Sequence, residues 1–339
     1  MVKNLLNLIK RIVKFFIRVK NNSYEYNHKY GNIIRYRKCQ WDKHFVKTSK
    51  EINLEENYLN FINDLDDESV KVASKELGRV FLINDGFSSR LNLFSKEEET
   101  NIEEAYRTIT SSILKLNDNC YAFRRYLLPI NEFEISTFIY NYGLDCINKA
   151  YLTNKCVIDA GAYIGDSSIV FEHELPLVSK IYSFEPSKST YSLLLDTIKL
   201  NKSEKIIPVN VALGEKSTSM PLVGMGMGLT LAENSDTRWK MNREMVNVVS
   251  LDDYVSKNNL NVGLIKTDLE GFEQEFLKGA INTIKTYKPT LMISIYHSAQ
   301  DYFQVKEIIK SLNLGYKFSL FKADDGYLIA GTLLICQVE

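Results

Sequence analysis

The chain has 339 residues and no net charge at pH 7, and it is 45% hydrophobic and 25% charged, which is the profile of an ordinary globular protein. Its five cysteines are scattered and form no CxxC pair, which argues against a structural zinc site and against a disulfide framework. Unpaired thiols favour a reducing, cytoplasmic compartment.

The first segment, residues 1–20 (MVKNLLNLIKRIVKFFIRVK), predicts a basic amphipathic helix. At about 100° per residue its basic and polar side chains gather on one face and its apolar side chains cover the rest. The charges are too frequent for a membrane-spanning helix, and no small-residue cleavage site follows. Such a helix can lie peripherally on an anionic membrane, such as the inner membrane face, or it can dock on the protein's own core.

Residues 21–150 predict a mainly helical N-terminal domain or extension. Spacing near 3.6 residues marks helices in ENYLNFINDL, DESVKVASKELGRVFLI, EEETNIEEAYRTITSSILKL and INEFEISTFIYNYGLDCI. From residue 151 to residue 339 the pattern changes to short apolar strands that alternate with helices. The strands are CVIDAGA, KIYSFEP, IIPVNVAL, GLIKTDLEG and TLMISIYH. This alternation predicts an α/β domain with a parallel sheet covered on both faces.

Two later segments, GYKFSLFKA and YLIAGTLLICQV, are joined by a DDG turn. They predict an antiparallel pair that completes the sheet. An insertion, SMPLVGMGMGLTLAENSDTRWKMNREM, separates IIPVNVAL from GLIKTDLEG. It predicts either a plain surface loop or a covering loop, made mobile by Gly224, Gly226 and Gly228, in which Arg238 and Trp239 contact a sugar.

The turn in VIDAGAYIGDSS, from Val157 to Ser168, gives the first indication of a ligand site. Ligands of open parallel sheets bind beyond the carboxyl ends of the strands. Gly161 and Gly165 allow the backbone to approach a ligand, and the following helix directs its first amides toward it. The dinucleotide pattern G-x-G-x-x-G is absent, and Asp159 adds negative charge. This disfavours NAD and favours a ligand with a cationic end, such as S-adenosylmethionine.

A second acid follows at the end of the next strand. Glu185 lies about twenty residues beyond the glycine turn, where an acid can hold both hydroxyls of a ribose. The next strand ends in VNVAL, which places Asn210, Val211 and Ala212 beside an adenine. The predicted cofactor-binding residues are Asp159, Gly161, Ala162, Tyr163, Gly165, Asp166, Glu185, Asn210, Val211, Ala212 and Asp268.

Five segments together carry a family resemblance: DAGAYIGDSS, YSFEPSKSTYSLLL, VNVALGE, LIKTDLEGFEQEFLKGA and PTLMISIYH. They resemble the FkbM-type family of SAM-dependent methyltransferases over about residues 120–339. The resemblance implies a class I, Rossmann-like methyltransferase fold with a seven-stranded, mostly parallel sheet and an antiparallel last strand. It also implies O-methylation, often of sugar hydroxyls. LFKADD and AGTLLIC depart from the commoner members, which have an Arg-His pair and a Glu-Thr-Val-Leu-Tyr segment there, so the acceptor side is expected to differ.

The candidate catalytic residues are His297, Asp268 and Glu270, which lie at the ends of two predicted strands. A sugar hydroxyl benefits from a general base, and histidine titrates near neutral pH. Asp268 and Glu270 could instead hold Mg²⁺ through hard oxygen ligands. The fifth strand supplies His297 and Ser298 rather than an acid and an amide, so no metal is expected.

The sequence therefore predicts a SAM-dependent O-methyltransferase that acts on a sugar of a surface glycan or its precursor. No nucleic-acid partner is expected. The alternative is a non-catalytic SAM-fold module that binds a glycan or a protein partner. The set formed by Asp159, Gly161, Gly165 and Glu185 favours the enzyme, because it predicts a working cofactor site.

Overall fold

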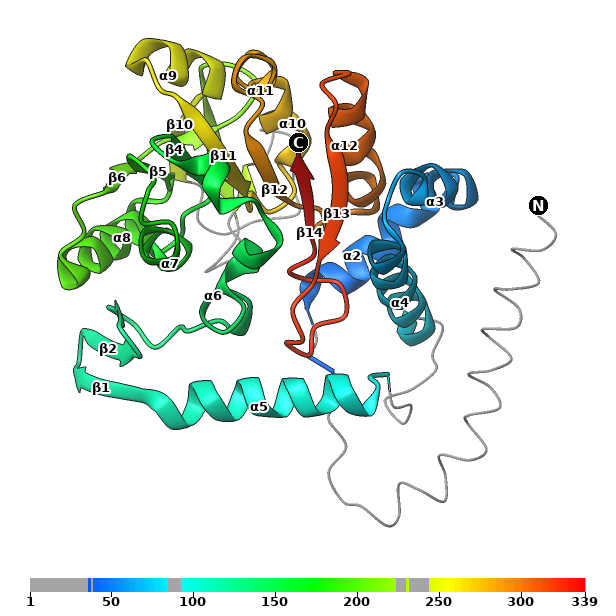
Figure 1. Cartoon of the computed structure of the whole chain (residues 1–339), viewed down its shortest axis with the longest axis horizontal. Coiled ribbons are helices and arrows are strands. Elements are labelled where there is room, and N and C mark those ends of the chain that lie inside the picture. The colour runs from blue at the N-terminus through cyan, green and yellow to red at the C-terminus, as the bar shows by residue number, and fades with distance from the viewer. Residues whose placement is uncertain (1–35, 38, 85–92, 224–229, 232–243, 339) are drawn as a thin grey trace.

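The computed structural model describes residues 36–37, 39–84, 93–223, 230–231 and 244–338 (Figure 1). The predicted amphipathic helix of residues 1–20 lies outside the described residues. Five residues of the predicted covering loop also lie outside them: Gly224, Gly226, Gly228, Arg238 and Trp239. Among the helices that are described, none has both the length and the hydrophobicity needed to cross a membrane.

A seven-stranded sheet forms the centre of the molecule. Its strands are β4 (Cys156–Ala160), β5 (Ile181–Phe184), β6 (Ile206–Val209), β11 (Val262–Thr267), β12 (Thr290–Ser294), β13 (Lys317–Phe321) and β14 (Leu333–Gln337). They lie in the order β13-β14-β12-β11-β4-β5-β6, and β14 runs antiparallel to both of its neighbours. The predicted mostly parallel sheet with an antiparallel last strand is confirmed. The strand order reverses beside β4, where such sheets bind ligands.

Helices cover both faces of this sheet, which explains why its central strands are apolar almost throughout. Every residue of β4 and β11 is buried. Ile158 and Ala160 face one hydrophobic cluster, and Val157 faces the other. One face carries α7 (Asp166–Glu174) and α8 (Lys188–Asn201). The other carries α9 (Leu251–Asn258), α10 (Glu273–Lys278), α11 (Ile281–Tyr287) and α12 (Ala299–Ser311) (Figure 1).

The helices that precede the sheet pack against one end of it. They are α2 (Gln40–Thr48), the 3-10 turn η1 (Ser49–Glu51), α3 (Leu54–Ile62), α4 (Asp67–Asn84) and α5 (Lys96–Ser112). Figure 1 shows α2, α3 and α4 gathered beside α12 and β13. Phe45 and Phe61 enter the same hydrophobic cluster as the residues of α12. The division into residues 21–150 and 151–339 stays a prediction.

The region before the sheet contains strands that the helical spacing did not predict. The helix expected to continue into SSILKL ends at Ser112, where Ile113 is extended. β1 (Ile113–Asn117), β2 (Cys120–Phe123) and β3 (Tyr126–Leu128) form an antiparallel sheet. Ile113 pairs with Phe123, so strand pairing overrides the local helical pattern.

The helix predicted in INEFEISTFIYNYGLDCI is also much shorter in the structure. It consists of α6 (Ile135–Phe138), and the 3-10 segments η2 (Asn141–Cys146) and η3 (Lys149–Leu152) follow it. Asn141, Tyr142 and Gly143 all have positive φ, which no right-handed helix accommodates. This break turns the side chain of Tyr142 toward the site described below.

The insertion contributes a second, four-stranded sheet. Its strands are β7 (Ala212–Leu213), β8 (Thr218–Val223), β9 (Thr230–Leu231) and β10 (Glu244–Val249), in the order β7-β10-β8-β9. β13 and β14 pair antiparallel as predicted, but the connection between them spans residues 322–332 and is no tight turn. Within it, Asp325 accepts hydrogen bonds from the backbone of Tyr327 and from Lys322.

Lys306 on α12 joins the N-terminal helices to the α/β domain. Its side chain is buried, and its ammonium donates to the carbonyl oxygens of Asn60 (3.0 Å), Phe61 (2.6 Å) and Asn63. These carbonyls lie at the end of α3, where acceptors have no partner within the helix and where a positive charge is favourable.

We expect Lys306→Met to lower the free energy of unfolding by about 3 kcal/mol, because it leaves several buried carbonyls without a donor. Lys310→Met is the matched control. Lys310 is exposed, and its ion pair with Asp64 is worth at most about 1 kcal/mol. Urea unfolding of both variants measures the difference. Equal loss in the two variants would contradict the role given to Lys306.

Glu76 on α4 is a buried acid beneath the loop that precedes β14. Its carboxylate accepts hydrogen bonds from the hydroxyls of Tyr302 (3.0 Å) and Thr332 (2.9 Å). Burial raises its pKa from 4.5 to about 7, although Lys322 and Arg79 act in the opposite direction. The folded chain therefore binds this proton more tightly than the unfolded chain.

Stability contributed by protonated Glu76 is present below about pH 4.5 and is lost as the pH rises to about 7. We expect Glu76→Gln to abolish this pH-dependent loss of stability, which is on the order of 3 kcal/mol for a pKa shift of this size. The measurement is urea unfolding at several pH values across the window. Glu55→Gln makes the same substitution at an exposed position and should keep the wild-type slope. If the unfolding free energy of Glu76→Gln changed with pH as it does in the wild type, Glu76 would not be the group responsible.

Candidate active site

A cavity of about 520 Å³ lies at the carboxyl ends of β4, β5 and β11. Its volume is within the range of small-molecule sites. Seven of the predicted cofactor residues line it: Gly161, Tyr163, Asp166, Glu185, Val211, Ala212 and Asp268. The other four, Asp159, Ala162, Gly165 and Asn210, are not among its described lining residues. The structure therefore brings together most of the predicted set and gives the remainder other roles.

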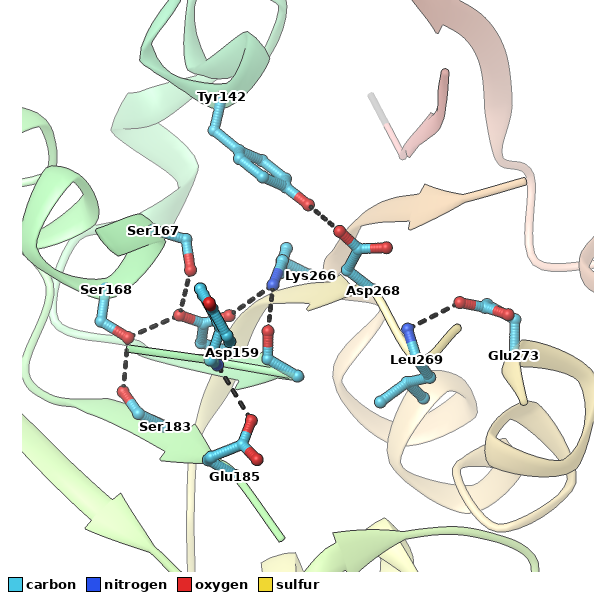
Figure 2. Close-up of polar contacts among 12 residues, drawn as sticks. Tyr142, Asp159, Ser167, Ser168, Ser183, Glu185, Lys266, Asp268, Leu269 and Glu273 are labelled. Atoms are coloured by element: carbon cyan, nitrogen blue, oxygen red, sulfur yellow. Dashed lines mark hydrogen bonds and ion pairs between the residues drawn. The ribbon is translucent and has the colours of Figure 1, made fainter. Parts of the chain in front are cut away.

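Asp159 is fully buried behind the cavity instead of facing a cationic ligand, which corrects the prediction. Its Oδ1 lies 3.0 Å from the Nζ atom of Lys266 on β11. Its Oδ2 accepts hydrogen bonds from Ser167 (2.7 Å) and Ser168 (2.5 Å) at the start of α7 (Figure 2). The negative charge is thus offset within the protein. Lys266 also donates to the carbonyl of Gly161 at 2.7 Å and lines the cavity itself.

The two glycines of the turn serve different purposes. Gly161 has a φ of 79°, and a Cβ added to it would lie 2.0 Å from the backbone oxygen of Asp268. Gly165 has a φ of 84°, and its Cβ would lie 2.6 Å from the side chain of Leu194 on α8. Gly161 therefore lets the turn meet the end of β11 at the cavity. Gly165 permits helix packing rather than the approach of a ligand, contrary to the prediction.

Glu185 follows β5 and faces the cavity from a largely buried position. Its carboxylate accepts hydrogen bonds from the backbone amides of Tyr163 (3.0 Å) and Ser187 (2.9 Å) and from the Thr190 hydroxyl (2.6 Å). Burial raises its pKa to about 7, although the hydrogen bond from Thr190 opposes this. The side-chain amide of Asn210 donates to the carbonyls of Glu185 and Pro186, and its contact with an adenine stays a prediction. It supports the backbone that carries Glu185.

The three predicted catalytic residues lie together at the ends of β11 and β12. His297 Nε2 lies 3.3 Å from Asp268 Oδ1 and 3.7 Å from Glu270 Oε2. Asp268 and Glu270 line the cavity, and His297 is fully buried behind them. The three candidates therefore lie side by side, but the histidine has no exposure of its own, and their catalytic roles stay predictions.

Glu273 was not predicted as a site residue, yet it organises this end of β11. Its buried carboxylate accepts hydrogen bonds from the backbone amides of Leu269 (2.7 Å, Figure 2) and Gly271 (3.0 Å). It also lies 3.1 Å from His297 Nδ1. Between these amides, Glu270 has a φ of 56°, which is unusual for a residue with a side chain. Glu273 therefore holds a strained turn that aims Glu270 at His297.

The charges of this cluster follow from the surroundings. Burial alone would lower the pKa of His297, but Glu273 and Asp268 outweigh it and raise the pKa well above its ordinary value. Burial alone would raise the pKa of Asp268, but His297 outweighs it and lowers the pKa. Burial raises the pKa of Glu270 to about 8. These directions favour the protonated form of His297 and the ionised form of Asp268.

Three aromatic side chains surround the cluster, and the sequence analysis missed them. Tyr296 donates its hydroxyl hydrogen bond to Asp268 Oδ1 at 3.0 Å, and Tyr142 approaches Asp268 Oδ2 at 3.5 Å (Figure 2). The ring of Trp41 lies edge-on to His297, with centroids 4.9 Å apart. All three rings line the cavity. The Tyr-His pair in ISIYH could have indicated Tyr296, but no local pattern indicates the other two.

Comparison with known proteins identifies the domain that carries this site. Residues 159–318 match the family described as the Methyltransferase FkbM domain. The chain carries an FkbM methyltransferase domain. This confirms the resemblance found in the sequence, and it confirms S-adenosylmethionine as the cofactor of the domain.

Two individual relatives agree with this assignment. "Methyltransferase 1" of Beauveria bassiana (strain ARSEF 2860) is 22% identical over 199 residues, which cover 50% of this chain and 80% of that protein. The crystal structure of Methyltransferase FkbM from Methylobacillus flagellatus KT aligns with a TM-score of 0.55 at 19% identity. That alignment covers 85% of this chain but spans only 60% of the Methylobacillus protein. It supports the α/β methyltransferase fold.

The FkbM domain of this chain fits its cofactor on structural grounds. Glu185 is a largely buried acid that faces the cavity, which suits the hydroxyls of a ribose. Val211 and Ala212 form an adjacent apolar surface. Gly161 leaves no side chain between the turn and the end of β11. These residues would hold the nucleoside part of S-adenosylmethionine.

We expect Gly161→Ala to destabilise the protein by about 3 kcal/mol and to weaken cofactor binding, because a Cβ cannot fit against the Asp268 carbonyl at a positive φ. Gly78→Ala is the matched control. Gly78 lies exposed on α4, and its added Cβ meets nothing within 4 Å. That variant should gain about 0.5–1 kcal/mol. Thermal unfolding and calorimetric binding of S-adenosylmethionine measure both effects. Wild-type stability and cofactor affinity in Gly161→Ala would contradict the close approach of Gly161 to the Asp268 carbonyl.

Proposed function

We propose that the protein transfers a methyl group from S-adenosylmethionine to a hydroxyl of a sugar, in a surface glycan or its precursor. The observation that carries this proposal is the wall around Asp268. There the rings of Trp41, Tyr142 and Tyr296 meet carboxylates in one cavity. Aromatic faces cover the apolar side of a sugar ring, and carboxylates accept hydrogen bonds from its hydroxyls.

Asp268 is the group best suited to accept the proton of the acceptor hydroxyl. S-Adenosylmethionine supplies an activated methyl group on a sulfonium, so the protein has to orient the acceptor and receive its proton. Asp268 lines the cavity, and its pKa is lowered by His297. His297 holds the Asp268 carboxylate at 3.3 Å and is poorly suited to act as the base itself, because it is fully buried and is not among the residues described as lining the cavity.

The N-terminal region adds side chains to the cavity that the methyltransferase domain itself does not supply. Cys39, Gln40 and Trp41 line the cavity from the start of α2. We propose that they contribute to recognition of the acceptor. The basic, amphipathic pattern of residues 1–20 supports peripheral contact with an anionic membrane surface, where lipid-linked glycan precursors are exposed.

The test uses the full-length protein, S-adenosylmethionine carrying a labelled methyl group, and a panel of sugar acceptors with free hydroxyls. We expect label in an ether-linked methyl group on a sugar. Asp268→Asn should lower kcat by about 100-fold or more. Glu185→Ala should raise the Kd for S-adenosylmethionine by about tenfold or more, because it removes a buried hydrogen-bond acceptor.

Glu204→Gln serves as the control for both variants, because Glu204 is exposed and lies outside the cavity lining. It should leave kcat and Kd unchanged. Cofactor binding by the wild type without transfer to any hydroxyl would favour the non-catalytic alternative. Transfer to nitrogen or carbon acceptors alone would exclude O-methylation as the activity.

A further inference from the structure

Three donor atoms converge at the end of the cavity in a way that the methyl-transfer proposal does not explain. One donor atom each from Asp268, Glu270 and His297 lies within 4.8 Å of the other two. Two of the separations are 3.3 and 3.7 Å. Neighbouring donors around a six-coordinate divalent ion lie roughly 3 Å apart, so small side-chain movements would complete the arrangement.

A second observation separates this group from an ordinary acidic cluster. His297 is fully buried, and although its Nδ1 lies 3.1 Å from Glu273 and its Nε2 3.3 Å from Asp268, neither contact is a well-aligned hydrogen bond. Glu270 Oε2 is buried and lacks such a bond as well. Buried polar atoms without hydrogen bonds are rare and costly, and they call for a partner. Both His297 Nε2 and Glu270 Oε2 face the same point.

We propose that Asp268 Oδ1, Glu270 Oε2 and His297 Nε2 bind one divalent metal ion. Two carboxylates and one neutral imidazole form a donor set suited to ions such as Mn²⁺, so the ion would take the place of the proton on His297 Nε2. The sequence disfavoured a metal because the fifth strand ends in a histidine instead of an acid. In the folded chain this histidine lies directly beside the two acids of β11 and its turn, so it supplies the third ligand itself.

The surroundings of His297 match those of a metal-binding histidine. Its Nδ1 lies 3.1 Å from the buried carboxylate of Glu273. Metal-bound histidines usually donate their other ring N–H to a carboxylate, which fixes the ring and its tautomer. Glu273 is itself held by two backbone amides, those of Leu269 and Gly271. It is therefore a positioning residue that orients His297 Nε2 toward the two acids.

The place of the site gives the ion a function, and this step rests on the proposed methyl transfer. Asp268 and Glu270 line the cavity, so the open coordination positions face the acceptor. A metal ion there would bind the acceptor hydroxyl oxygen and make its proton easier to remove. Asp268 Oδ2, which lies on the side of Tyr142, stays available to receive that proton.

The test is a titration of the full-length protein with Mn²⁺, after treatment with EDTA and desalting. Electron paramagnetic resonance measures the free ion. We expect one saturable site per chain. Glu270→Gln should raise its Kd by about tenfold or more, and Glu273→Gln by about 10- to 100-fold although it supplies no ligand. Glu204→Gln, at an exposed position outside the cavity, should bind as the wild type does.

Thermal unfolding checks that each variant is folded, and Asp268→Asn replaces Glu270→Gln if that variant is not. Absence of saturable Mn²⁺ binding in the millimolar range would overturn the proposal, and so would wild-type affinity in Glu270→Gln. Calorimetry with S-adenosylmethionine on the same samples separates the two proposals. Mn²⁺ binding without cofactor binding would overturn methyl transfer and leave the metal site standing. Full methyl transfer in excess EDTA would overturn the role of the ion.

Discussion

The ion pair between Lys266 and Asp159 is the constraint on which the site depends. The two residues pair directly across the central strands β11 and β4, and neither side chain is exposed to water. Removing either partner of a buried pair leaves an uncompensated charge, at a cost of about 3–5 kcal/mol.

The pair also fixes the geometry around it. Asp159 binds the first serines of α7, which sets the start of that helix. Lys266 binds the carbonyl of Gly161 and so holds the glycine turn against β11. One buried ion pair therefore positions both the start of α7 and the glycine turn, which border the cofactor cavity. The methyltransferase cavity is preorganised because this buried ion pair and its hydrogen bonds hold the surrounding backbone in place.

The sequence predicted the sheet and much of the cofactor cavity, because those features follow from local patterns. Apolar strands that alternate with helices determine the sheet, and an acid at the end of the second strand determines the place of Glu185. The contacts of Asp159, Gly165 and Asn210 within the protein could not be predicted, for one shared reason. Their partners, which include Lys266 and Leu194, are distant in the sequence or lie on another element.

The residues around Asp268 that the sequence analysis missed are likewise placed by the folded structure and not by a local sequence pattern. Trp41 reaches the cavity only because α2 packs on α12, and Tyr142 does so only because the chain leaves the helical region at Asn141. Glu273 looked like an ordinary acid in the first turn of a helix. Its partners are backbone amides of a turn with positive φ, and single-sequence patterns do not reveal such conformations.

The departures from the family pattern lie where an acceptor would be recognised. LFKADD and AGTLLIC contribute Phe321, Asp325 and Leu333 to the cavity wall. Gly161 and Glu185, which line the cavity, are the residues expected to hold the nucleoside part of the cofactor. Specificity for an acceptor is set by the groups that contact it, and conservation of the cofactor chemistry does not constrain them. The altered wall and the added Trp41 therefore fit an enzyme that keeps the methyl donor of its family and selects a different acceptor.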